Sequence, residues 1–211
     1  METHQKCVGR EILADSEDRF TIRYVFSADV MPSLQADITY SIDRKGDLDV
    51  TVRYHGAPNR PQLPLFGLRF ATTKPLDTVT WAGLSGETYP DRYKGAQFGI
   101  HSEKPGISNY LVPQECRNHM NTHWAKLSLD KNALFLEKTD KPFHFSAIPY
   151  TPHQLEAAFH QEELPLPNRT VVTVCGKMRG VGGIDTWGND VEAPYHVHSD
   201  QNISFSFRIR G

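Results

Sequence analysis

The sequence predicts an all-β protein, an antiparallel sandwich with one short helix, forming a single domain over residues 1–211. The first observation is that apolar and polar residues alternate with a period of two, most clearly over 20–26, 48–54 and 203–209. Such alternation turns one face of a strand toward a core and the other toward water, as antiparallel strands do. The second is that only one segment has helical spacing. A chain of 211 residues is long enough to bury the core of one large β domain.

Turn residues separate the alternating runs. Residues 43–47, Asp-Arg-Lys-Gly-Asp, lie between two of them and predict a hairpin loop. Residues 130–132 do the same between the runs around Leu127 and Phe135. By contrast, Arg10 to Asp18 is charged and aperiodic, which predicts either a short first edge strand or a loose tail.

The helix is expected to begin at a capping box. Thr151 can cap it, Pro152 suits its first position, and Gln154 completes the box. The apolar residues that then recur at helical spacing are Leu155, Ala158 and Phe159. The helix is expected to stop at two prolines, Pro165 and Pro167.

Composition excludes several classes of partner. A formal charge of −2, with no Lys/Arg stripe, argues against nucleic acid as the main partner. No apolar run reaches membrane-spanning length, and the N-terminus lacks the apolar stretch of a signal peptide. The three cysteines are widely spaced and odd in number, so a disulfide framework is not expected. We expect a cytoplasmic protein without membrane contact.

The usual metal and phosphate signatures are missing. Neither a metalloprotease-type histidine pair nor a Cys-x-x-Cys motif occurs. His196 and His198 could face the same side of a strand, but no third ligand lies nearby, so we interpret them as surface histidines. Gly180 to Gly183 lacks the third glycine and following helix of a phosphate loop, and is interpreted as a tight bend between strands. We assign no metal and no cofactor to this chain.

Two acidic residues in a glycine-rich loop, Glu87 and Asp91, leave two interpretations open. They could form part of a structured site, or each could anchor its own loop through backbone N–H groups. Glycoside hydrolysis needs paired carboxylates, about 5–5.5 Å apart in retaining enzymes. No pair of acidic residues in the sequence stands out as suited to this arrangement, so we assign no catalytic residue.

One loop does suggest a ligand. Trp187 stands among small and polar residues between Gly182 and Asp190. Such a setting favours an indole face displayed at the surface, against which the C–H patches of a sugar ring can pack. The alternative, that Trp187 fills a gap between loops, stays open.

The chain also resembles the small chain of lactose-type β-galactosidases. Four stretches are similar to motifs of that family and occur in the same order: Trp81–Arg92, Tyr110–Glu115, Pro142–Ala147 followed by Tyr150, and Gly180–Trp187. The resemblance covers roughly residues 63–209. It implies an antiparallel supersandwich shared with aldose mutarotases, and membership of glycoside hydrolase family 2.

The same resemblance implies that catalysis and the completion of the galactoside site are divided between two parts of the enzyme. In that family the acid/base and nucleophile glutamates lie in a separate barrel domain, so this chain is expected to be inactive alone and to need a large catalytic subunit. Any Mg²⁺ or Na⁺ is expected in that partner. The residues expected to bind the galactoside are Trp187, Asp185 and Gly183. Those expected to structure the surrounding loops are Glu87, Tyr89, Asp91, Arg92 and Gly182.

Departures from the family pattern qualify these expectations. Leu65 stands where the family has arginine, and Ile184 replaces the first of two aspartates before Trp187. An early family segment is missing, so we expect an N-terminally truncated domain whose open sheet edges favour self-association. Two alternatives remain. One is a stand-alone carbohydrate-binding or assembly module. The other is a mutarotase-like epimerase, which needs an acid–base pair of histidine and carboxylate that the sequence does not reveal.

Overall fold

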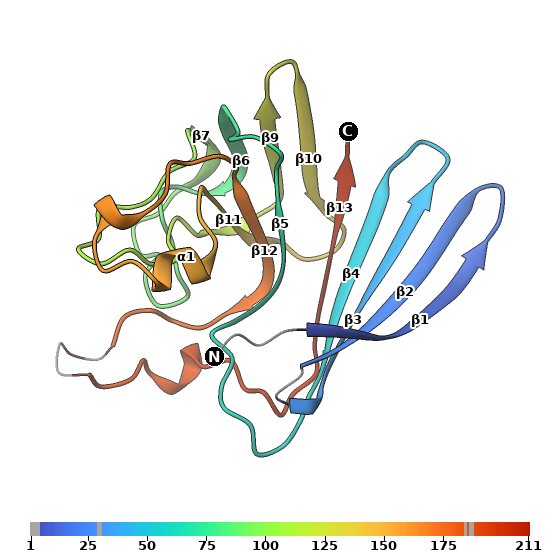
Figure 1. Cartoon of the computed structure of the whole chain (residues 1–211), viewed down its shortest axis with the longest axis horizontal. Coiled ribbons are helices and arrows are strands. Elements are labelled where there is room, and N and C mark those ends of the chain that lie inside the picture. Colours follow the sequence, from blue (N-terminus) through green and yellow to red (C-terminus); the bar gives the residue numbers. More distant parts are fainter. Residues whose placement is uncertain (1–4, 29–30, 184, 186–187) are drawn as a thin grey trace.

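The computed structural model describes residues 5–28, 31–183, 185 and 188–211, with the backbone alone for 31–34. Within these residues the chain forms two antiparallel sheets (Figure 1). The larger has nine strands in the order β1 (Gln5–Asp15), β2 (Arg19–Ala28), β3 (Met31–Asp43), β4 (Leu48–His55), β13 (Ile203–Arg210), β10 (Asn132–Lys138), β9 (Trp124–Leu129), β6 (Thr78–Leu84) and β7 (Phe98–Glu103). The smaller has four, in the order β5 (Leu65–Ala71), β12 (Val171–Met178), β11 (Phe143–Ile148) and β8 (His119–Thr122).

The predicted all-β sandwich with one short helix is confirmed. Both hairpins form where the turn residues indicated them. Asp43 accepts hydrogen bonds from the backbone N–H groups of Lys45 and Asp47, and Gly46 takes the positive φ of 85° that closes the turn. At the second hairpin, Asp130 likewise adopts a positive φ of 53°.

The helix α1 (Pro152–Glu156) begins as predicted, with the capping box between Thr151 and Gln154 fully formed. Its expected extension through Phe159 is wrong. The helix ends after one turn, and Phe159 is 74% exposed. Of its residues only Leu155 reaches the interior, so no apolar face exists to hold further turns against the body.

The N-terminal segment is an edge strand, and the loose-tail alternative is wrong. β1 pairs with β2 along its length, with two register shifts, and Glu11 accepts a hydrogen bond from Arg23 at 2.6 Å. Most side chains of β1 are exposed on both faces. Its sequence therefore has no apolar alternation, because its partner strand and not a core holds it in place.

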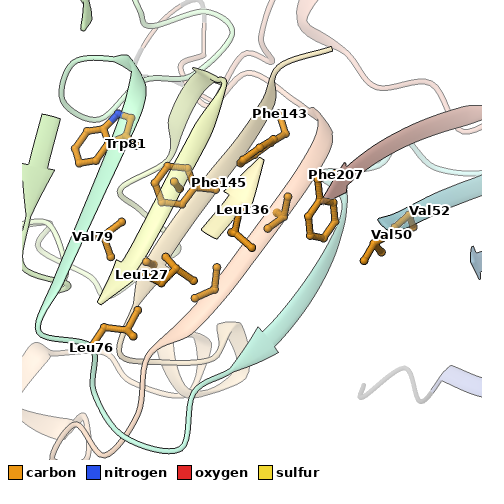
Figure 2. Packing of buried hydrophobic residues seen from close by; sticks show 14 residues of the cluster. Val50, Val52, Leu76, Val79, Trp81, Leu127, Leu136, Phe143, Phe145 and Phe207 are labelled. Atoms are coloured by element: carbon orange, nitrogen blue, oxygen red, sulfur yellow. The ribbon is translucent and has the colours of Figure 1, made fainter. Parts of the chain in front are cut away.

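The core lies between the two sheets (Figure 2). Trp81, Leu127, Leu136 and Phe207 of the larger sheet meet Phe145 and its neighbours on the smaller one. Each such side chain stabilises the fold by about 1.5–3 kcal/mol when it leaves water. As Figure 1 shows, β1 and β2 extend beyond this packed region, whereas Ile38 and Tyr40 of β3 still pack against its margin.

The outer face of the smaller sheet is polar. Along β12, Val172 and Val174 point into the core, so Thr173 between them faces outward. In register with Thr173 lie Arg69 of β5 and Ser146 of β11. Loops after β6, before β8 and after β12 lie over this face, and the candidate site is there.

Candidate functional site

Asp91 connects the loop after β6 to the glycine-rich loop after β12. Its Oδ1 accepts a hydrogen bond from the N–H of Val181 at 3.0 Å, and its Oδ2 accepts one from the N–H of Gly182 at 2.6 Å. The expectation that this carboxylate anchors its own loop is therefore wrong. Asp91 instead binds the backbone of a loop about ninety residues further along the chain.

The glycines of that loop allow close approach. A Cβ on Gly182 would overlap the guanidinium of Arg92, and one on Gly180 would lie 2.8 Å from Cγ of Asp91. Residues 180–183 form neither a turn nor a bend, and the next element is a 3-10 turn, so the interpretation of this stretch as a tight bend between strands is wrong. These positions need the smallest residue because the loop after β6 packs directly on their backbone.

Glu87 organises a second cluster. Its carboxylate accepts hydrogen bonds from the hydroxyls of Tyr89 at 2.7 Å, Tyr110 at 2.8 Å and Ser108. Burial opposes ionisation, but the three hydroxyls outweigh it and hold the pKa of Glu87 below its usual value. Burial and the same carboxylate raise the pKa of Tyr110 to about 12. Glu87 is thus a stable anion that ties the loop after β6 to residues 108–110.

Gly183 and Asn189, which we call the neck of the loop that carries Trp187, lie against each other. Gly183 lies so near the carbonyl of Asn189 that a Cβ would overlap it, and Asp185 accepts a hydrogen bond from the Asn189 amide at 2.5 Å. Just outside this neck, Arg179 pairs with Asp190. Trp187 itself lies outside the described residues, as do residues 184 and 186. The structure therefore places Gly183 and Asp185 at the base of the segment that carries the indole.

His196 and His198 do not lie on a strand, contrary to expectation. They follow a 3-10 turn, η2 (Ala193–Tyr195). The ring of His196 is engaged by Gln62 and by the carbonyl of Val191, both at 2.9 Å. Across the described part of the chain, no group of three His, Cys, Asp or Glu side chains could hold a metal ion.

Sequence reasoning missed the histidine–carboxylate pairs of the structure, which include His55 with Asp37 and His196 with Asp190. The most buried histidine among them is His119. His119 of β8 lies 3.3 Å from Glu103 of β7, and its other ring nitrogen contacts the carbonyl of Gly86 at 2.8 Å. The ring also stacks on Trp81, with centroids 3.9 Å apart. With 2% of the side chain exposed and both nitrogens engaged, His119 is inaccessible to a substrate. Nothing in the linear sequence signals this pair, because its members come from different sheets.

Sequence reasoning also missed two adjoining hollows on the outer face of the smaller sheet, each of about 320 Å³. They share four lining residues: Tyr89, Gln114, Glu115 and Val181. The first reaches the sheet at Ser146 and Thr173. The second lies against Glu87 and Arg92. Three of the loop residues inferred from the family resemblance, Glu87, Tyr89 and Arg92, thus line these hollows, whereas Asp91 and Gly182 do not.

Fold and site together define a β-sandwich protein in which Asp91 holds the glycine-rich stretch after β12 and Gly183 lies against Asn189. Its sequence matches the family described as β-galactosidase small chain over residues 2–209. The chain therefore belongs to the β-galactosidase small chain family. The match includes the first three strands, which none of the four quoted motifs covers.

Individual relatives agree with this assignment. The β-galactosidase small subunit of Latilactobacillus sakei is 41% identical over 95% of this chain, which spans 66% of that relative. The β-galactosidase of Streptococcus thermophilus is 34% identical over 92% of this chain, which spans 19% of that much longer protein. Among solved structures, a proposed aldose 1-epimerase of Escherichia coli K12 is similar, with 12% identity, a TM-score of 0.45 and coverage of 95% of this chain and 67% of its own. No helix among the described residues is long and apolar enough to span a membrane.

Proposed function

We propose that this chain acts as the small subunit of a two-subunit β-galactosidase of glycoside hydrolase family 2, working on lactose in the cytoplasm. A large subunit would supply the two glutamates for retaining hydrolysis of terminal β-D-galactosides, and any Mg²⁺ or Na⁺. This chain would complete the galactoside site. Family membership and the name of the Latilactobacillus sakei relative support the proposal.

The closed neck at Gly183 and Asn189 is the observation that carries this role. A segment that contributes an aromatic platform to a sugar must be held in place before the sugar arrives, because ordering it on binding costs affinity. Asp91 fixes the chain just before the neck, and the Arg179–Asp190 pair fixes it just beyond. In the proposal Trp187 then contacts the galactoside, while Asp185 and Gly183 support it from the base.

The acidic residues beside the neck suit a chain that leaves catalysis to its partner. The carboxylate of Glu87 is occupied by three hydroxyl donors, and that of Asp91 by two backbone N–H groups. A general acid needs a raised pKa, whereas that of Glu87 is lowered. We accordingly propose that the isolated chain does not cleave lactose.

Reconstitution with a large subunit tests the proposal. Trp187→Ala should raise KM more than it lowers kcat, because stacking stabilises bound substrate and transition state alike. The expected loss is about 1–2 kcal/mol, or roughly five- to thirtyfold. Co-purification of the variant with the large subunit controls for assembly. An unchanged KM, or cleavage of lactose by the small chain alone, contradicts the proposal.

Self-association belongs to the same proposal. β1 is the outermost strand of the larger sheet, and its Val8, Ile12 and Leu13 are 53%, 57% and 48% exposed. Unpaired strand edges with apolar side chains favour pairing with another chain. Sedimentation of the isolated chain over a range of concentrations measures this directly, and a monomer throughout excludes it.

A non-catalytic carbohydrate-binding module is the second candidate function. The two hollows favour it, since they belong entirely to this chain. Calorimetric titration of the isolated chain with galactose and lactose separates the two candidates: an independent module binds sugar without any large subunit.

A further inference from the structure

We propose that His119 is held as an imidazolium between Gly86 and Glu103 and thereby positions the loop after β6. The charge of the ring is a property of this chain alone, whereas the effect on the enzyme rests on the proposed function. His119 lies on β8 of the smaller sheet, and Glu103 lies on β7 at the edge of the larger one. The ring therefore bridges the two sheets beside the start of the loop.

Both ring nitrogens of His119 face acceptors. Nδ1 lies 2.8 Å from the carbonyl oxygen of Gly86, which can only accept a hydrogen bond, so Nδ1 carries a proton. Nε2 lies 3.3 Å from Oε1 of Glu103. An ionised carboxylate also only accepts, so this contact needs a second proton on the ring. A histidine that donates from both nitrogens is positively charged.

Glu103 is held in its ionised form. Its Oε1 also lies 3.3 Å from Nη1 of Arg117, a pairing that does not involve the histidine. Burial raises the pKa of Glu103, but the hydrogen bond and charge of His119, together with the charge of Arg117, hold it below its usual value. The carboxyl group therefore has no proton to give at neutral pH, and Nε2 of the histidine must donate.

Aromatic rings surround the buried charge. The indole of Trp81 stacks on His119 with centroids 3.9 Å apart, and Phe145 of β11 lies at 5.0 Å from the same imidazole. His101 of β7 also packs on this indole, with centroids 5.5 Å apart. A cation over an aromatic face is attracted by the ring quadrupole, most strongly where water is excluded, and His119 and Trp81 are each 2% exposed. A charge that is paired, hydrogen-bonded and stacked in this way is stable in an interior.

The bond from His119 to Gly86 is one of several that fix the start of the loop. The N–H of Thr88 donates to the carbonyl of Asn118 at 2.7 Å, and Nδ2 of Asn118 donates to the carbonyl of Thr88 at 2.8 Å. Further along the same loop, Asp91 holds the glycine-rich stretch before the neck. His119 is thus a positioning residue, which acts on the neck through this loop and does not contact substrate.

NMR of the chain containing nitrogen-labelled histidine tests the charge of the ring. The signals of His119 can be identified by their proximity to the indole of Trp81, and burial slows exchange of the ring protons. We expect an N–H proton on each ring nitrogen at neutral pH. A single N–H on this ring overturns the proposal.

Glu103→Gln tests the cause of that charge. The amide keeps an acceptor oxygen but removes the negative charge, so the ring should revert to one N–H. Glu137→Gln is the matched control, because it removes a carboxylate that pairs with Arg210 at 3.3 Å on the same sheet. Two ring protons in Glu103→Gln would show that the carboxylate does not hold the charge. Glu103 is partly exposed, so this test stands even if variants of His119 fail to fold.

His119→Asn and His119→Gln test positioning in the enzyme reconstituted with a large subunit. The amide nitrogen of asparagine takes the place of Nδ1 and can donate to Gly86, whereas that of glutamine reaches the place of Nε2. KM for lactose should rise about two- to tenfold in His119→Gln, as loss of one hydrogen bond does, and less in His119→Asn. In both variants kcat should stay within about twofold of the parent, because neither touches the reacting atoms. Equal KM values for the two variants would overturn the positioning role.

Trp187→Ala in the same assay separates this inference from the proposed function. If Trp187→Ala raises KM while both His119 variants keep the parent value, His119 does not position the site. If Trp187→Ala leaves KM unchanged, the proposed function fails, and the NMR result still decides the charge of His119.

Discussion

The carboxylate of Asp91 and the backbone N–H of Gly182 are joined by a 2.6 Å hydrogen bond across 91 positions of sequence. Asp91 belongs to the first family-like motif, and Gly182 belongs to the last. The bond makes the two motifs one structural unit, in which the loop after β6 fixes the base of the loop that carries Trp187.

Asp91→Asn should loosen the neck. An asparagine has one acceptor oxygen and no charge, so it cannot hold both N–H groups of Val181 and Gly182 as the carboxylate does. We expect KM for lactose to rise about twofold to thirtyfold in the reconstituted enzyme, which corresponds to a loss of about 0.5–2 kcal/mol of binding free energy. Asp140→Asn, on an exposed residue, is the matched control. Equal kinetics for both variants would rule out a positioning role for Asp91.

Gly182→Ala should disturb the same contact by steric overlap with Arg92. Overpacking of this kind costs about 1–3 kcal/mol, measurable by urea denaturation. The overlap involves the end of a flexible side chain, so adding Arg92→Ala should restore much of the stability. Gly9→Ala is the control, because its Cβ would make only an ordinary contact at 3.6 Å. If the double variant is no more stable than Gly182→Ala, the stated cause is wrong.

Glu87→Gln should lower the free energy of unfolding by about 1–3 kcal/mol at neutral pH, because three hydroxyl donors lose their charged acceptor. The folded-state pKa of Glu87 is lowered, so its contribution is present above the unfolded pKa of about 4.3 and is lost as pH falls through the folded value. In denaturation measurements between pH 7 and pH 3, the free energy of unfolding should fall less steeply with decreasing pH for the variant than for the parent. Parallel curves for variant and parent would contradict this assignment.

His144 should make the free energy of unfolding depend on pH in a higher pH range than Glu87 does. Burial, with a smaller effect of Lys177, lowers its pKa to about 4, and its Nδ1 is buried without a partner among described residues. The unfolded chain therefore binds the proton more tightly. The contribution of His144 to stability is fully present well above pH 6.5 and falls as pH drops toward 4, by on the order of 3 kcal/mol. His144→Gln should flatten the curve between pH 7.5 and 5, whereas His153→Gln, on an exposed histidine, should not.

Local patterns in the sequence were sufficient for much of the fold. The runs that became β4 and β13 alternate because one face of each strand meets the core, and that requirement is visible within eight residues. The run that became β2 alternates in the same way, but none of its side chains belongs to that core. The capping box at Thr151 is equally local. The length of α1 could not be predicted from such a local pattern, because the end of a helix depends on whether the rest of the protein offers a surface on which its next turn can pack.

The resemblance to the small-chain family named the loops of the site but not how they connect. Glu87, Asp91 and Gly182 were expected to structure loops, and the structure shows which atoms they contact. Neither the attachment of Asp91 to the glycine-rich loop nor the hollows at Gln114 could be anticipated. Both depend on segments that meet only after the two sheets have packed.

The all-β class, the strand periodicity, the turns and the family could be predicted from the residues alone, because each depends on neighbouring residues or on ordered motifs. The three-dimensional fold was needed to show that β1 is an edge strand, that His119 is buried beside Glu103, and that Asp91 binds Gly182. Those features join residues that are distant in sequence or lie on different strands. The packing of two sheets brings them together, and no local pattern records that packing.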